Sequence, residues 1–142
     1  MLETAAEHGF RFDTVQMPLN VMDAHFESFE KIVLPILVKE GIGILGMRPL
    51  GDCHIPASKT VGPVVCLHYA MNLPTGVVIT GCDSMGILEQ ARLAARTLRP
   101  MSLEQVKAHL AKTARAGQAS AFERYKTTHD FDSTVAHPRW LG

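Results

Sequence analysis

The stretch GVVITGCDSMGILEQ, residues 76–90, joins a short run of β-forming residues to a helix through a single glycine. Residues 77–80 are typical of a strand, and Gly81 follows them directly. The first N–H groups of the next helix have no partner inside that helix, and such groups bind anions, phosphate above all. The junction therefore predicts a phosphate site, with a glycine that serves packing alone as the alternative.

Two further strand–loop–helix units precede this one. Strands are predicted at residues 12–17, where Pro18 ends the strand, at 42–47 and at 77–80. Helices are predicted at 23–41 with a kink at Pro35, at 63–74, at 85–98 and at 102–117, where Ser102 and Gln105 form a capping box. A helix is also expected to end at Gly9, residues 51–62 to form a loop, and the tail 118–142 to hold only a short helix at 122–126.

This alternation of strands and helices predicts right-handed crossovers and a parallel sheet, so the fold class is α/β. A parallel sheet is normally covered on both faces, and three strands leave two unpaired edges. We therefore expect the chain to be the later part of a larger unit, marginal as a monomer and able to self-associate through its open sheet edges.

The composition is that of one soluble domain, because 46% of the 142 residues are hydrophobic and 20% are charged. Fourteen basic and fourteen acidic residues balance, and no basic tract points to a nucleic-acid partner. The apolar runs are too short to span a membrane, and the N-terminus is not a signal peptide. Cys53, Cys66 and Cys82 have neither an even count nor CxxC spacing, so we expect a cytoplasmic protein without a disulfide framework.

Several polar residues have a plain structural explanation. Asp52, Cys53 and His54 are adjacent in the predicted loop, but zinc needs three or four converging ligands, so no metal site is predicted. Ser84 can cap the following helix, and this role is compatible with phosphate binding. Tyr69 lies in the helix between the second and third strands, where it is expected to face the sheet or solvent.

Three motifs carry a resemblance to a known family. DTVQMPLN (13–20), GIGILGMRPLG (41–51) and VVITGCDSMGILEQAR (77–92) resemble, in this order and at similar separations, the C-terminal half of the aldo-keto reductases. Those enzymes are (β/α)8-barrel oxidoreductases that use a nicotinamide cofactor. The resemblance implies that residues 1–142 are one partial barrel domain, the C-terminal part of a TIM-type barrel. It would hold about three βα units, a C-terminal helix and a tail, without the N-terminal half.

The resemblance also implies a nicotinamide dinucleotide site, since such barrels commonly bind phosphate on the loops after strands seven and eight. Gln16 matches the residue that binds the nicotinamide carboxamide. Met47 stands where the family often has an aromatic residue, and Arg48 replaces a serine near the phosphates. Leu50 and Gly51 match the loop along the pyrophosphate.

The third motif is implied to bind the adenosine end of the cofactor. The matching positions are Gly81, Cys82, Asp83 and Ser84 at the phosphates, with Leu88 and Gln90 beside the adenine. Ile87 stands where many relatives have an arginine for the 2′-phosphate, and Ala91 where they often have asparagine. Because Asp83 suits a ribose hydroxyl better than a phosphate, both NADP and NAD remain open.

The activity implied is NAD(P)-dependent carbonyl reduction or alcohol oxidation with a small carbonyl substrate. The catalytic Asp, Tyr, Lys and His of the family come from the first half of the barrel, so no residue here is expected to be catalytic. The alternatives are a non-catalytic half-barrel that binds a nucleotide or a partner, and an unrelated small α/β phosphate-binding domain.

Overall fold

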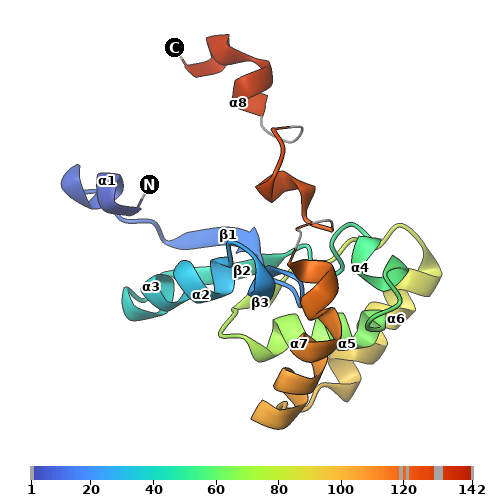
Figure 1. The fold of residues 1–142 in the computed structure, drawn as a ribbon. Coiled ribbons are helices and arrows are strands. Elements are labelled where there is room, and N and C mark those ends of the chain that lie inside the picture. Colours follow the sequence, from blue (N-terminus) through green and yellow to red (C-terminus); the bar gives the residue numbers. More distant parts are fainter. Residues whose placement is uncertain (1, 119, 121, 130–132, 142) are drawn as a thin grey trace.

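A three-stranded parallel sheet forms the centre of the molecule (Figure 1). The computed structural model describes residues 2–118, 120, 122–129 and 133–141. Its strands are β1 (Thr14–Pro18), β2 (Gly43–Met47) and β3 (Val77–Val78), hydrogen-bonded in the order β1-β2-β3. Both pairs are parallel, as predicted.

The strands differ from the prediction only at their ends. β1 begins two residues later than predicted and includes Pro18. β3 is two residues long, although the Ile79 N–H still donates to the Gly46 carbonyl at 2.7 Å. Pro18 is tolerated because β1 is an edge strand, where a missing N–H breaks no ladder.

Helices make up most of the remaining structure. They are α1 (Leu2–Glu7), η1 (Asp23–His25), α2 (Phe29–Ile32), α3 (Leu34–Lys39), α4 (His54–Ala57), α5 (Pro63–Asn72), α6 (Met85–Thr97), α7 (Leu103–Gly117), η2 (Arg124–Lys126), α8 (Ser133–Ala136) and η3 (Pro138–Leu141). The capping box at Ser102 and Gln105 is confirmed. The single kinked helix predicted at 23–41 is wrong, because Ser28 caps a new helix and Pro35 lies in the first turn of another. None of the described helices is both long and apolar enough to cross a bilayer.

Two apolar clusters form the core, and one of them includes residues of the sheet. One packs α2 and α3 against one face of the strands, through Met17, Leu37 and Ile44 among others. The other lies among the loops after the strands and α5–α7, around Ile55 and Tyr69. In Figure 1 the helices α2, α3 and α5 accordingly lie on one side of the strands.

The opposite face of the sheet is left largely uncovered. Gln16, Leu45 and Val77 form one row across the three strands. Gln16 is exposed, Leu45 is half-buried, and Val77 keeps 52% of its surface accessible. Sequence alternation on these strands therefore produces one packed face and one face open to solvent.

The prediction that the chain forms the C-terminal part of a TIM-type barrel is wrong. The described residues form a small open parallel sheet that does not close into part of a TIM-type barrel. Closure requires many tilted strands paired in a ring, whereas among the described residues β1 and β3 are both edges. The βα units were predictable because their patterns are local, but closure depends on pairing partners that those patterns do not specify.

The residues after α7 fold back toward the sheet before leaving it. Glu123 is buried, and η2 lies beside the loop between β1 and α2, whereas α8 and η3 extend away from the body (Figure 1). The predicted short helix at 122–126 appears as η2, a single 3-10 turn. The tail positions 119, 121, 130–132 and 142 lie outside the described residues.

Candidate functional site

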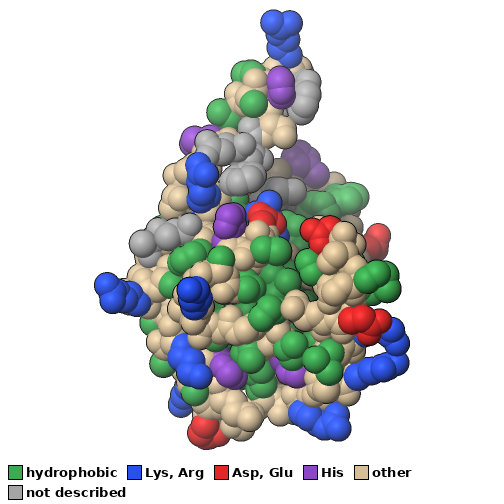
Figure 2. All heavy atoms as spheres, turned by 90° about the vertical axis from the view of Figure 1, so that its right-hand side faces the viewer, with side chains coloured by type: hydrophobic (Ala, Val, Ile, Leu, Met, Phe, Trp, Pro, Cys, Tyr) green, Lys and Arg blue, Asp and Glu red, His purple; other side chains and the backbone are tan. Residues whose placement is uncertain are grey.

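A cavity of about 320 Å³ opens at the carboxyl ends of the strands. These ends point toward the face drawn in Figure 2, where apolar side chains gather at the centre and lysines and arginines lie mainly around them. Crevices outside the carboxyl ends of parallel strands are the usual ligand sites of open α/β sheets. The cavity is lined by Gln16, Met47, Arg48, Pro49, Leu50, Asp52, Cys53, Ile79, Thr80, Gly81, Asp83 and Ile87.

The cavity brings together residues from all three resemblance motifs. Six of the eleven predicted cofactor-binding residues line it, namely Gln16, Met47, Arg48, Leu50, Gly81 and Asp83. The expectation that Gln16, Met47 and Gly81 lie at the same end of the sheet is confirmed. Their convergence follows from the parallel register, because β1, β2 and β3 all end at this edge.

The other five predicted residues do not line the cavity. Gly51 is buried, and a side chain there would meet Ile55 at 2.8 Å. Cys82 and Ser84 are exposed neighbours of the lining residues, and the Ser84 hydroxyl accepts the Ile87 N–H as the N-cap of α6. Leu88 and Gln90 lie further along α6, exposed and half-buried respectively.

The first wall of the cavity is the open face of the sheet. The Gln16 side-chain amide donates to the Met47 sulfur at 3.1 Å, which ties β1 to β2 at the cavity floor. Ile79, which is 39% exposed and directly follows β3, continues this wall. The wall therefore offers a polar amide beside a thioether and an aliphatic side chain, a surface suited to a polar aromatic ring.

The second wall is a loop with strained backbone. Arg48, Gly51, Asp52 and Cys53 all adopt positive φ, between 53° and 67°. Three of these residues carry a side chain, and left-handed backbone at such residues persists where surrounding contacts impose it, often at ligand sites. The Arg48 guanidinium pairs with the Asp52 carboxylate at 2.5 Å, with 28% and 51% of the two side chains exposed.

The third wall is the turn into α6. A side chain at Gly81 would meet no atom within 4 Å, so the space beside its backbone is open. Asp83 and Ile87 border the cavity from this side, and α6 presents the positive end of its dipole here. An arginine, a helix start and a carboxylate therefore surround one small cavity, so a ligand that carries both anionic and hydroxyl groups fits its charges.

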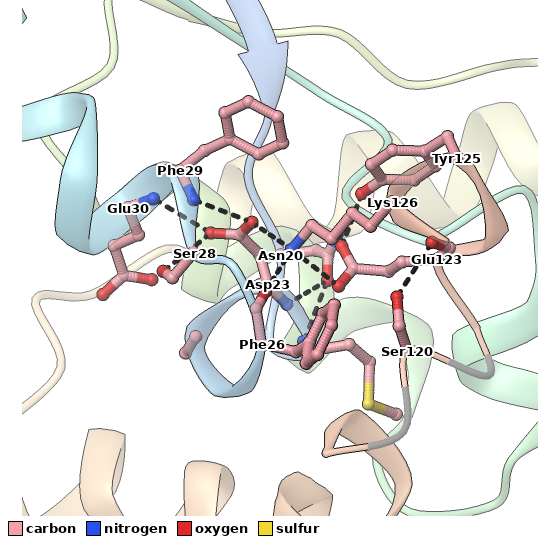
Figure 3. A network of polar contacts seen from close by, with 12 residues as sticks. Asn20, Asp23, Phe26, Ser28, Phe29, Glu30, Ser120, Glu123, Tyr125 and Lys126 are labelled. Carbon is pink, nitrogen blue, oxygen red and sulfur yellow. Dashed lines mark hydrogen bonds and ion pairs between the residues drawn. The ribbon is translucent and has the colours of Figure 1, made fainter. Parts of the chain in front are cut away.

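Sequence reasoning missed the contribution of the C-terminal residues. The Tyr125 ring lies under the Arg48 guanidinium, with 5.0 Å between the guanidinium carbon and the ring centroid. Figure 3 shows that Tyr125 belongs to a network of polar side chains around Asp23 and Lys126. No motif marks this tail as part of a site, and its local signals are the short helix predicted at 122–126 and the three-residue spacing of Glu123 and Lys126.

The other tyrosine is remote from the cavity, as expected. Tyr69 is buried on α5 and donates to the Glu30 carboxylate at 2.6 Å. Burial, reinforced by the negative charge of Glu30, raises the pKa of Tyr69 well above its ordinary value. Burial likewise raises the pKa of Glu30, against the effect of the Tyr69 hydrogen bond. The pair therefore joins α5 to α2 and takes no part in the cavity.

The remaining candidate groups are dispersed. Among the described residues, no three His, Cys, Asp or Glu side chains gather as a metal site would require. Asp52 and Cys53 line the cavity without His54, which starts α4. Cys66 is buried on α5, and burial raises the pKa of its thiol to about 12, so it is an inert core residue.

Comparisons of the chain with protein-family models, with curated proteins and with solved structures find no match. The geometry of the cavity and the resemblance of the three motifs are therefore the basis for assigning a function.

Proposed function

We propose that the chain binds a nicotinamide dinucleotide in the cavity at the carboxyl ends of its strands. It would do so as the cofactor-binding part of a cytoplasmic oxidoreductase similar to the aldo-keto reductases, acting on a small carbonyl compound or the matching alcohol. The observation that carries this proposal is the convergence of Gln16, Met47, Arg48 and Gly81 on one cavity from three separate motifs.

The residues present fit the parts of such a cofactor. Gln16 offers an amide to the nicotinamide carboxamide, and Met47 offers a thioether to its ring. Arg48 and the backbone N–H groups at the start of α6 suit the pyrophosphate. When bound, the cofactor supplies the hydride, and the chain supplies orientation and charge.

The choice between NAD and NADP rests on two residues of the third wall. Asp83 and Ile87 both border the cavity. A carboxylate accepts hydrogen bonds from a ribose 2′-hydroxyl and repels a 2′-phosphate, and an isoleucine offers no counter-charge. We therefore propose little preference for NADP over NAD, and weak binding of both, because the cavity is near the lower end of the about 300–1,000 Å³ typical of ligand sites.

A second candidate function is nucleotide binding without catalysis by this chain. The lining residues include no tyrosine, histidine or lysine, so the cavity offers no general acid of the kind that carbonyl reduction requires. Turnover would then need groups that do not belong to this lining.

The free thiols of Cys53, Cys66 and Cys82 fit the proposed cytoplasmic location.

The test is calorimetric titration of the chain with NADH and with NADPH. Gly81→Val fills open space beside the α6 turn, so it should weaken binding of both at least about tenfold while leaving unfolding unchanged. Gly62→Val is the matched control, because a side chain there also meets nothing within 4 Å but lies outside the cavity lining. Unchanged affinity in Gly81→Val, or no binding by the wild type, would overturn the proposal.

A further inference from the structure

Residues 122–126, termed here the C-terminal segment, are fastened to the loop after β1 by a buried lysine. Lys126 Nζ lies 2.7 Å from Asp23 Oδ1 and 3.0 Å from Glu123 Oε2, and it donates to the Phe26 carbonyl at 2.8 Å. The Lys126 side chain is 3% exposed, and the two carboxylates are 0% and 1% exposed. A buried cation with two buried carboxylates permits few alternative arrangements, because separating them strands a charge.

A second set of contacts fixes the rotation of the segment. Asn20 donates its side-chain amide to Glu123 Oε1 at 3.0 Å, and the Tyr125 hydroxyl donates to the same oxygen. Asn20 Oδ1 in turn accepts the N–H groups of Met22 and Asp23, so it is held by its own loop. Figure 3 shows these side chains converging from the two segments. The Tyr125 ring is therefore held at both ends, by its backbone and by its hydroxyl.

The segment reaches the candidate site at two points. The Tyr125 ring lies 5.0 Å from the guanidinium carbon of Arg48, a cavity-lining residue. The Phe122 carbonyl lies 3.6 Å from the position that a Gly51 side chain would take, so the segment also borders the site loop. Each contact meets the stretch of positive-φ backbone that forms the second wall.

We propose that the C-terminal segment is a positioning element of the site: Lys126 locks the segment in place, and the Tyr125 ring holds the Arg48 guanidinium for the phosphate of a nucleotide ligand. This inference rests on the proposed function, because it assigns Arg48 to a phosphate. Tyr125 acts through Arg48 and is a positioning residue.

The physical basis is preorganisation of a long side chain. The negative face of an aromatic ring attracts a guanidinium, and the Asp52 carboxylate holds the same group from another side at 2.5 Å. An arginine held in this way loses less conformational entropy when an anion arrives. Without the ring, Arg48 keeps its charge and its Asp52 partner but loses one of the contacts that order its side chain, so the ligand must supply more of that ordering.

The experiment compares ADP with adenosine as calorimetric probes, since only ADP carries phosphate. Loss of the ring in Tyr125→Leu should weaken ADP binding about two- to fivefold, the range expected for a partly exposed cation–π contact. Tyr125→Phe keeps the ring and should retain most of the ADP affinity. Arg48→Met should lose about tenfold or more. The double variant of Tyr125→Leu with Arg48→Met should bind ADP as Arg48→Met alone does. Adenosine affinity should be the same in all variants.

A ligand-free readout separates positioning from folding. The Arg48 side-chain NMR signals should show a ring-current shift in wild type that disappears in Tyr125→Leu and in Lys126→Met. If Lys126→Met does not fold, the loss of the Arg48 ring-current shift is judged from Tyr125→Leu alone. An unshifted Arg48 signal in wild type, additive losses in the double variant, or equal losses for ADP and adenosine would each overturn the inference. If the wild type binds neither ADP nor NADH, the proposed function fails as well. If the wild type binds both and Tyr125→Leu binds ADP equally well, only this inference fails.

Discussion

Lys126 Nζ and Asp23 Oδ1 lie 2.7 Å apart in the protein interior, although 103 positions separate the two residues. Asp23 also accepts the N–H groups of Phe29 and Glu30 and the Ser28 hydroxyl, at 2.9–3.1 Å. The Asp23 carboxylate thus accepts the first N–H groups of α2 and also binds Lys126 in the segment after α7. The contact explains how a tail without sequence motifs comes to lie beside the candidate site.

Removing the buried cation should strongly destabilise the fold. We expect Lys126→Met to lower the free energy of unfolding by about 3–5 kcal/mol, because it leaves the carboxylates of Asp23 and Glu123 buried without a counter-charge. Urea denaturation followed by circular dichroism measures the change. Lys107→Met, at an exposed position of α7, is the control and should stay within about 0.5 kcal/mol of wild type. Equal stability of the two variants would contradict the role given to the ion pair.

The end of α7 should tolerate no side chain at Gly117. A Cβ there would lie 2.6 Å from His25 Cδ2 and 2.9 Å from its Cβ, so Gly117→Ala should cost about 1–3 kcal/mol through overpacking. Gly86→Ala should instead raise the stability of the fold, because its Cβ would approach no atom closer than 4.0 Å. Since Gly86 lies in α6 and alanine is the better helix former, the free energy of unfolding should rise by about 0.5–1 kcal/mol. Thermal unfolding of both variants measures the two effects. A midpoint temperature that shifts in the same direction in both variants would contradict the prediction.

His25 should make the free energy of unfolding fall as the pH drops through the weakly acidic range. Burial, then the positive charge of Lys31, lowers the pKa of His25 below its ordinary value of 6.5 in the folded state. The unfolded chain therefore binds the proton more readily, so this contribution is fully present above pH 6.5 and is lost as the pH falls through the folded pKa. Denaturant titrations of wild type and His25→Gln between pH 7.5 and about pH 5 test this. The variant should lose less stability on acidification, and parallel curves would exclude His25 as a source.

Cofactor preference should respond to the carboxylate at the third wall. We expect NADH and NADPH to bind the wild type within about threefold of each other, a difference below 1 kcal/mol. Asp83→Asn removes a negative charge beside the cavity and should improve NADPH binding relative to NADH by about fivefold, from roughly 1 kcal/mol of lost repulsion. The ratio of the two calorimetric affinities is the measurement. A ratio that does not change would place the ribose away from Asp83.

The uncovered face of the sheet should drive association at high concentration. Val77 in β3 is 52% exposed and Ile79, just after the strand, is 39% exposed. Among the described residues, no strand pairs with the outer edges of β1 and β3. Light scattering should therefore show a mass that rises with protein concentration. Val77→Lys places a charge on this face and should reduce the rise. A wild-type chain that stays monomeric and unfolds cooperatively at all concentrations would contradict the expectation.

Local patterns in the sequence were sufficient for the βα units. The strand composition of residues 77–80, the capping box at Ser102 and the proline at the start of α5 each depend on near neighbours, and each was predicted correctly or within two residues. The parallel order followed as well, because consecutive βα units permit few topologies. The same order brought Gln16, Met47 and Gly81 to one edge of the sheet.

Tertiary structure alone decided whether the sheet closes and what completes the site. An open sheet and a barrel share the same local βα pattern, and they differ only in strand pairing over long distances. The contact between Arg48 and Tyr125, and the ion pair that holds it, join positions whose spacing has no periodicity to detect. The sequence by itself determined the elements and their order, because hydrogen bonding and capping are local. Strand pairing and the packing of buried charges determined the rest, because both join residues that are far apart in the chain.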